Sequence, residues 1–264
     1  MRQGVLDLRA FYASPLGAVT RQMISRKVVE AWSSVNGLDV LAMGYATPFV
    51  GAWAAGARRV IAAMPSGQGV EPWPTGGGNQ SCLVDEMALP LRNALFDRIL
   101  AVHALEESGN PGALLREVWR VLAPSGRVIL AVTARHGLWA DADATPFGHG
   151  RPFSRRQLER LLEEADLAPV GWTRALYAPP VPWMSRWAEG FERVGARVWP
   201  PFAGIILIEA MKTTFAVLPR GAKVGAVVRP AFQPVPIGRT LAFGAGPRQA
   251  SRSPAAPNGK GVRP

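Results

Sequence analysis

The stretch DVLAMGYATPF, residues 39–49, joins a buried run of residues to a turn and the start of a helix. The apolar run ends at Gly44, and Thr47-Pro48 then opens a helix, with Thr47 as N-cap and Pro48 at the first helical position. Nucleotide-binding folds use this strand–loop–helix order, but Ala46 and Pro48 stand where such a loop usually carries further glycines. The stretch therefore predicts the scaffold of a nucleoside site.

Strand and helix patterns alternate along the chain on both sides of this stretch. Such alternation predicts an α/β, Rossmann-like, doubly wound fold: a mainly parallel seven-stranded sheet with helices on both faces. Ligands of such sheets bind at the carboxyl ends of the strands, near the switch in strand order. We expect strands over 38–44, 58–64, 80–86, 96–105, 127–134, 171–179 and 204–212, and helices over 14–32, 47–57, 110–122 and 154–165.

Three regions are predicted along the chain. Residues 1–36 form an N-terminal helical segment, residues 37–215 form the main domain, and residues 216–264 form a basic tail rich in proline and glycine. The tail has no sustained period, which predicts disorder. A helical insertion at about 180–200, with Met184 and Trp187 among its apolar positions, is expected either to pack on the body or to act as a lid or dimer contact.

Composition limits the classes of protein and the partners to be considered. The chain has 264 residues, 48% of them hydrophobic, and no apolar run near the roughly 18 residues of a membrane span. A single cysteine, Cys82, excludes an internal disulfide, and we expect a cytoplasmic protein. Eight of the eleven net positive charges belong to residues 216–264, so nucleic acid is expected to bind only weakly, through the tail. The sequence leaves the oligomeric state open.

Four stretches resemble the class I S-adenosylmethionine-dependent methyltransferases, in particular the type 11 small-molecule group. They are VLAMGYATPF, VDEMALPLRNALFDRILAVHALE, LLREVWRVLAPSGRVILAV and PFSRRQLERLLEEADL, within residues 37–172. The resemblance makes 37–215 a methyltransferase-like domain and implies S-adenosylmethionine as cofactor. It also implies methyl transfer to an unidentified small-molecule acceptor, of which the sequence names neither the compound nor the methylated atom.

The resemblance also implies where the cofactor lies. The glycine loop would approach it closely, and the helix N-terminus after the loop would face the methionine carboxylate. Asp85 would contact the adenine amino group, although a turn cap is an equal structural role for it. The expected cofactor-binding residues are Gly44, Tyr45, Ala46, Met64, Asp85, Glu86 and Val102.

Two departures from the family pattern weaken that assignment. The acid that the family places at the end of its second strand, to bind the ribose hydroxyls, is replaced by Ala63 or Met64. Each charge-assisted hydrogen bond lost and not replaced costs about 1.5–3 kcal/mol, and Ser66 or Gln68 could supply a neutral substitute. These losses leave a second hypothesis open, a non-catalytic binding or regulatory protein of the same fold. A Tyr45 or Phe49 ring inside the hollow would leave no room for a nucleoside.

Catalytic and substrate-binding residues are less clearly marked. His103, beside the methyl-transfer position at the end of the fourth strand, is the candidate base, because imidazole titrates near neutrality; a purely structural role is the alternative. His136, Trp139 and Arg151, in the loop after the fifth strand, are candidates to line a substrate pocket, with ordinary loop packing as the alternative. The histidine and aspartate spacing there matches no recognised metal site, so we expect no bound metal.

Overall fold

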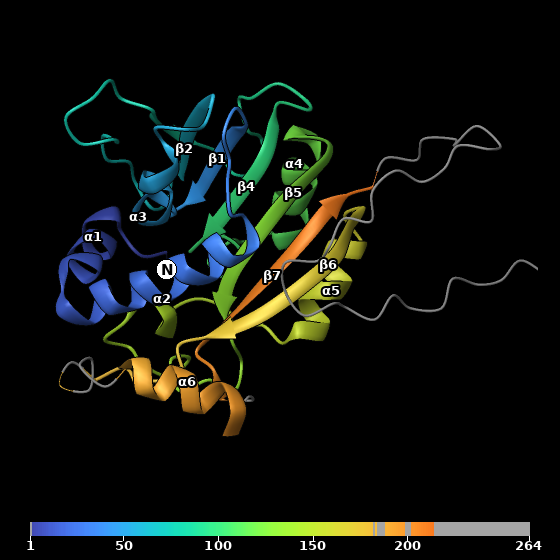
Figure 1. Ribbon diagram of the computed structural model, residues 1–264. Helices are drawn as coiled ribbons and strands as arrows, with labels where there is room; N and C mark the ends of the chain where they lie inside the picture. Colours follow the sequence, from blue (N-terminus) through green and yellow to red (C-terminus); the bar gives the residue numbers. More distant parts are fainter. Residues whose placement is uncertain (1, 182, 184–187, 199–201, 214–264) are drawn as a thin grey trace, which may run out of the picture.

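The computed structural model describes residues 2–181, 183, 188–198 and 202–213. They form a seven-stranded sheet of order β3-β2-β1-β4-β5-β7-β6, in which only β7 runs antiparallel to its neighbours (Figure 1). This confirms the Rossmann-like prediction. The strands are β1 (Asp39–Gly44), β2 (Arg59–Pro65), β3 (Ser81–Val84), β4 (Phe96–Val102), β5 (Leu122–Thr133), β6 (Leu167–Ala175) and β7 (Ile205–Lys212).

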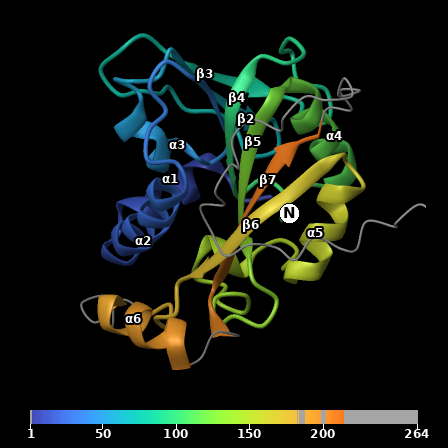
Figure 2. The same cartoon turned by 45° about the vertical axis from the view of Figure 1, so that its right-hand side comes forward.

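Helices cover both faces of the sheet. Helices α1 and α2 lie on one face, α4 and α5 lie on the other, and α6 lies near the end where β6 stops (Figures 1 and 2). Each face has its own buried apolar cluster, which is why the central strands are buried on both sides. The helices are α1 (Val5–Ala13), α2 (Pro15–Ala31), α3 (Thr47–Val50), α4 (Pro111–Val121), α5 (Arg155–Glu163) and α6 (Ala188–Val198), with 3-10 turns at Gly51–Trp53 and Pro146–Gly148.

Two helices begin where the sequence predicts. The Asn110 side chain accepts a hydrogen bond from the amide of Ala113 at the start of α4. Ser154 and Gln157 form the reciprocal capping box at the start of α5. Each cap satisfies amide groups that the helix itself leaves unpaired.

The segment after the glycine loop differs from its prediction. A helix over 47–57 was expected, but α3 ends at Val50, and its N-cap is Ala46, without a side-chain cap bond, instead of Thr47. A 3-10 turn follows, and the chain then leads to β2. The Gly56 carbonyl accepts a hydrogen bond from the Gly37 amide just before β2 begins. Glycine disfavours a helix interior by about 1 kcal/mol, so Gly51 and Gly56 give the physical reason for the early end.

The predicted N-terminal helical segment, residues 1–36, contains two helices: α2, as expected over 14–32, and α1, whose bounds the sequence analysis did not give. Helix α1 buries Val5, Leu8 and Tyr12 against the sheet side. These residues are three and four positions apart, which is the helical spacing that could have indicated the helix. Ser14 ends α1 and caps α2 by accepting a hydrogen bond from the Gly17 amide.

A buried charge cluster ties α2 to the strands that it covers. Glu209, in β7, is fully buried, and its Oε1 accepts hydrogen bonds from Trp32 Nε1 at 2.8 Å and from Arg127 Nη1 at 2.9 Å. The sequence analysis read β7 as a continuous apolar run, and Glu209 is the exception within it. Because an unpaired buried charge is costly, this cluster fixes α2 over β5 and β7.

Several predictions concern residues that the structure does not describe. Met184, Trp187 and residues 216–264 lie outside the described residues, so the predictions for the tail and for those insertion positions stay predictions. Within the described part, none of the helices combines the length and apolar character needed to traverse a bilayer.

Candidate active site

The turn after β1 requires glycine at position 44. Gly44 has a φ of +74°, and a Cβ atom there would lie 2.3 Å from the carbonyl oxygen of Val102. The next amide, that of Tyr45, donates to the same carbonyl at 2.8 Å. The expected unusual backbone angle is therefore present, and the close approach it permits is first of all between β1 and β4.

The short helix after this turn removes one expected contact. Helix α3 has only four residues and begins at Thr47, after the buried N-cap Ala46. The dipole of a helix grows with the number of aligned peptide units, so four residues provide little positive potential. The sequence-based assignment of a methionine carboxylate to this helix N-terminus therefore has no support in the structure.

Residues 2–12, here called the cover segment, extend over the carboxyl ends of the central strands. The Val5 amide donates to the Gln68 carbonyl at 2.8 Å, after β2. Arg2 Nη1 lies 2.6 Å from a carboxylate oxygen of Glu86, after β3, and Arg2 Nη2 donates to the Ala104 carbonyl at 3.1 Å, after β4. The segment thus spans the crevice in which ligands of this fold bind.

An aromatic cluster closes the same region from the α1 side. The Tyr12 ring stacks on Tyr45 with 5.8 Å between centroids, and meets the Phe49 ring edge-on at 5.5 Å. Both loop rings are buried, and the Tyr45 hydroxyl donates to Glu71 at 2.9 Å. The ring that lies against both loop aromatics therefore comes from the cover segment, a contribution the sequence did not indicate.

The end of β2 combines apolar side chains with one polar neighbour. Ala63 and Met64, the two positions at which the family's ribose-binding acid is expected, are both fully buried. Gln68, three residues beyond the end of β2, is 3% exposed, and its Nε2 donates to the Gly44 carbonyl at 3.3 Å. Its Oε1 is buried and has no hydrogen-bond partner.

The two acidic residues after β3 differ in burial: Asp85 faces solvent and Glu86 faces the interior. Asp85 is exposed, and its carboxylate accepts a hydrogen bond from the Met87 amide at 2.9 Å, which is the turn-cap alternative. Glu86 is buried and paired with Arg2. The contact between Asp85 and adenine stays a prediction, and Glu86 is the member of the pair that faces the cover segment.

His103 follows β4 and lies at the centre of a buried polar chain. It is fully buried with a φ of +50°, a strained angle for a residue with a side chain. Its Nε2 is 2.8 Å from the Tyr12 hydroxyl, and its Nδ1 is 3.5 Å from a carboxylate oxygen of Glu106. A tyrosine, an imidazole and a carboxylate are therefore in sequence at the carboxyl end of β4.

The electrostatics of this chain assign its protons. Burial and the nearby Glu106 carboxylate raise the pKa of Tyr12 well above its ordinary value of 10.0, so its hydroxyl keeps its proton. The Glu106 carboxylate can only accept and lies beside Nδ1, which places the imidazole proton on Nδ1 and makes the Tyr12 hydroxyl the donor to Nε2. This tautomer leaves Nε2 as the basic nitrogen.

The candidate substrate residues of the loop after β5 do not come together. Trp139 is buried and donates its Nε1 proton to the Ala178 carbonyl at 2.8 Å, and its ring meets Phe147 at 5.5 Å, so it packs the loop. His136 is exposed. Arg151 is exposed too, with its guanidinium 5.6 Å from the Phe153 ring. Among the described residues no group of three metal-binding side chains is found.

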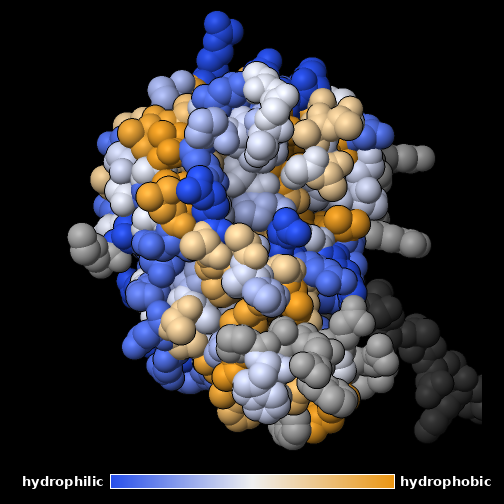
Figure 3. Space-filling view, turned by 90° about the vertical axis from the view of Figure 1, so that its left-hand side faces the viewer, coloured by the Kyte–Doolittle hydropathy of each residue, from blue (hydrophilic) through white to orange (hydrophobic). Residues whose placement is uncertain are grey.

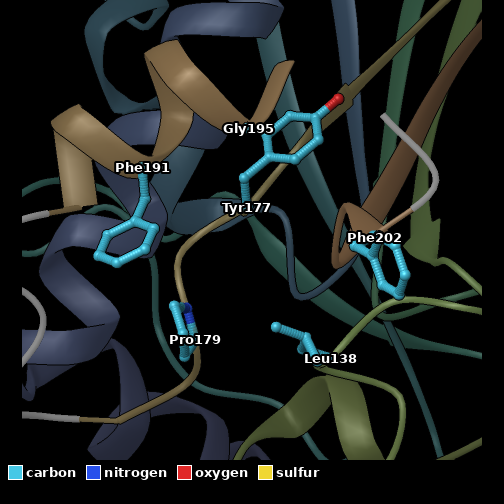
Figure 4. Close-up of a pocket in the computed structure, with 6 residues that line it drawn as sticks. All are labelled: Leu138, Tyr177, Pro179, Phe191, Gly195 and Phe202. Atoms are coloured by element: carbon cyan, nitrogen blue, oxygen red, sulfur yellow. The ribbon is translucent and has the colours of Figure 1, made fainter. Parts of the chain in front are cut away.

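An apolar cavity of about 330 Å³ lies beside this loop. Figure 4 shows Phe191 from α6 and Leu138 from the loop on opposite sides of it. Trp139 and Phe147 lie between this part of the loop and His103, whose ring is 4.7 Å from that of Phe147. In the space-filling view from the α1 side, apolar atoms gather towards the end of the molecule where α6 lies (Figure 3). The cavity is lined by Leu138, Tyr177, Pro179, Phe191, Gly195 and Phe202.

The sequence matches a known protein family. The family model described as a methyltransferase domain matches residues 31–170, more than half of the chain. The chain belongs to the class I S-adenosylmethionine-dependent methyltransferases. It is an enzyme of methyl transfer, and S-adenosylmethionine is the cofactor of its family. No curated protein sequence matches it.

Solved structures share the fold of this methyltransferase at low identity. The 1,6-didemethyltoxoflavin-N1-methyltransferase of Burkholderia thailandensis, solved with S-adenosylhomocysteine, has a TM-score of 0.50 and 19% identity over 74% of this chain and 79% of its own. The [4+2]-cyclase SpnF has a TM-score of 0.51 and 19% identity, covering 72% and 81%. The YcgJ protein of Bacillus subtilis has a TM-score of 0.50 and 15% identity, covering 72% and 99%.

Buried polar atoms beneath the cover segment are the observation that fits a polar, positively charged cofactor. Within the described residues, four buried side-chain oxygens there have neither a hydrogen bond nor an ion pair, although such atoms are normally satisfied in a folded protein. Two of the four belong to glutamates, whose charge favours a sulfonium. The atoms are Gln3 Oε1, Gln68 Oε1, Glu106 Oε2 and Glu107 Oε1.

Several of these residues were missed by the sequence analysis. Arg2, Tyr12 and Glu107 are in no family motif, and Glu106 was passed over beside His103. The helical spacing of Val5, Leu8 and Tyr12 was the one available signal for a packed N-terminal helix. No local pattern could show that this helix covers the carboxyl ends of the strands.

Proposed function

We propose that this methyltransferase acts on a small-molecule acceptor. The observation that carries the proposal is the complete burial of His103 beneath Tyr12, at the strand end where methyl transfer takes place in this fold. A small acceptor reaches a centre covered by its own chain with a smaller movement of the cover segment than a nucleic acid or a folded protein surface would need. The net charge of residues 1–215 is only +3, which gives this part of the chain little electrostatic attraction for nucleic acid.

We assign two roles to the residues of the site: binding of the cofactor and transfer of the acceptor's proton. When bound, S-adenosylmethionine supplies an electrophilic methyl group on a positively charged sulfur. Residues of the β1 turn, Met64, Glu86 and Val102 line the cofactor side, and Glu106 and Glu107 complement the positive charge. Exclusion of water beneath the cover segment strengthens these electrostatic contacts.

His103 takes the proton of an acceptor that arrives as an alcohol or amine. The acceptor oxygen or nitrogen bonds to the methyl carbon as the sulfur–methyl bond breaks and its electron pair stays on the sulfur. The proton of the acceptor passes to His103 Nε2. Glu106, next to Nδ1, stabilises the imidazolium that results. Because Tyr12 donates to the same Nε2, its hydroxyl must turn away or withdraw with α1 before the acceptor can use that nitrogen.

Transfer of a labelled methyl group tests the choice of acceptor. The full chain is incubated with S-[methyl-³H]adenosylmethionine and with separated low-mass and macromolecular fractions of a cell extract. We expect label in the low-mass fraction, and less of it with His103→Gln, which is a similar-sized side chain without the base. Label found only in RNA or protein would overturn the proposal.

A further inference from the structure

The ribose position poses a problem that the chain must solve, if the proposed function holds. An adenosyl group carries two adjacent ribose hydroxyls, and burying them without partners is costly. Met64 offers no acceptor at the end of β2. A replacement has to come from a side chain near the ends of β1 and β2.

Gln68 lies in that place and has an unused acceptor. The turn after β2 positions it, because its amide donates to the Pro65 carbonyl at 2.9 Å. Its side-chain Nε2 reaches the Gly44 carbonyl at 3.3 Å, which places the amide group beside the glycine turn of β1. Its Oε1 is buried without a partner although the residue is only 3% exposed.

Neighbouring acids are less suited to the role. Glu71 accepts the Tyr45 hydroxyl with Oε1, and its Oε2 lies 3.6 Å from Arg9. Glu86 is paired with Arg2. An amide oxygen accepts two hydrogen bonds, so a single Gln68 Oε1 can serve both ribose hydroxyls.

We propose that Gln68 is the ribose-binding residue of this methyltransferase, in place of the acid missing at Met64. The inference rests on the proposed function, because it requires an adenosyl ligand. A neutral acceptor forms a weaker hydrogen bond than a carboxylate. The chain therefore binds the ribose through a neutral contact that Gln68→Ala removes.

Calorimetric titration of the full chain tests the assignment without any turnover. The probes are S-adenosylhomocysteine and its 2′,3′-dideoxyribose analogue. We expect Gln68→Ala to weaken S-adenosylhomocysteine about tenfold and to leave the affinity for the analogue unchanged. Gln68→Met keeps the side-chain length without the amide and should show the same selective loss. Gln80→Ala, which removes the same amide group from an exposed side chain just before β3, is the matched control and should leave both affinities unchanged.

The outcomes separate this inference from the function on which it rests. Wild-type binding with no change in Gln68→Ala would overturn the role of Gln68 and leave methyl transfer standing. Equal weakening of both probes would also overturn it, because the side chain would then act only through the Gly44 carbonyl. No heat for the wild type at millimolar ligand would overturn both. Should Gln68→Ala fail to fold, Gln68→Met decides: an unchanged affinity for S-adenosylhomocysteine, or the same loss for both probes, contradicts the proposal.

Discussion

At the scale of single residues, Gly44 combines a left-handed backbone conformation with a close neighbour. Its φ of +74° disfavours any side chain, and a Cβ would lie 2.3 Å from the Val102 carbonyl. We expect Gly44→Ala to lower the free energy of unfolding by about 2 kcal/mol or more, from strain and crowding together. Urea unfolding measures it. Gly78→Ala is the matched control, because nothing lies within 4 Å of the added atom; equal losses would contradict the prediction.

His103 gives the second residue-scale prediction. With an identified acceptor, His103→Gln should lower kcat about 10²- to 10⁴-fold, the usual contribution of a positioned general base. Binding of S-adenosylhomocysteine, followed by calorimetry, should change little, because the amide retains the size and polarity of the side chain. Glu106→Gln should give a smaller loss in kcat, since it removes the charge next to Nδ1 and leaves the imidazole in place. An unchanged kcat for His103→Gln would show that His103 has only a structural role.

At the scale of elements, the strands and the distal helices follow directly from sequence patterns, and the cover segment does not. Buried runs and caps such as Asn110 and Ser154 are local signals, and the structure confirms them. Arg2 meets Glu86 across 84 positions of sequence, and Tyr12 meets His103 across 91. Periodicity within a window contains no information on such pairs. His103 could be named as the candidate base because it lies in a family motif. That Tyr12 and Glu106 contact its two ring nitrogens could not be predicted.

Arg2 is expected to hold the cover segment closed. It lies 2.6 Å from Glu86 and 3.5 Å from Glu107, and entry of a nucleoside requires this segment to move. Arg2→Ala should therefore increase hydrogen–deuterium exchange of residues 2–12. Arg9→Ala is the matched control on the same segment, because Arg9 is 61% exposed and its contact with Glu71 is 3.6 Å. Exchange that is equal in the two variants would contradict the prediction.

The same substitution should make stability depend on pH. Burial, with the charge of Glu106, raises the pKa of Glu107 from 4.5, while Arg2 counteracts the shift. An acid with a raised folded-state pKa contributes stability that is fully present below pH 4.5 and is lost as the pH rises through its folded pKa. Without Arg2 that pKa rises further, so the Tm deficit of Arg2→Ala relative to wild type should grow as the pH rises above 4.5. A deficit that is constant with pH would exclude this origin.

At the scale of the whole molecule, one buried carboxylate connects regions that are far apart in sequence. Glu209 joins Trp32 of the N-terminal region to Arg127 of β5. Removing one member of such a buried pair leaves the other charge unpaired, so we expect Glu209→Ala to cost about 3–5 kcal/mol. Glu209→Gln should cost less, because an amide oxygen can still accept the Trp32 hydrogen bond.

A surface ion pair provides the control for this prediction. Glu164 lies 3.6 Å from Arg160 with both side chains more than half exposed, and Glu164→Ala should cost at most about 1 kcal/mol. Urea unfolding of the three variants measures the differences at neutral pH. If Glu209→Ala lost no more than Glu164→Ala, the cluster would not be what holds α2 on the sheet. The cover segment continues into α2 through Ser14, so its position over the crevice would then depend on apolar packing alone.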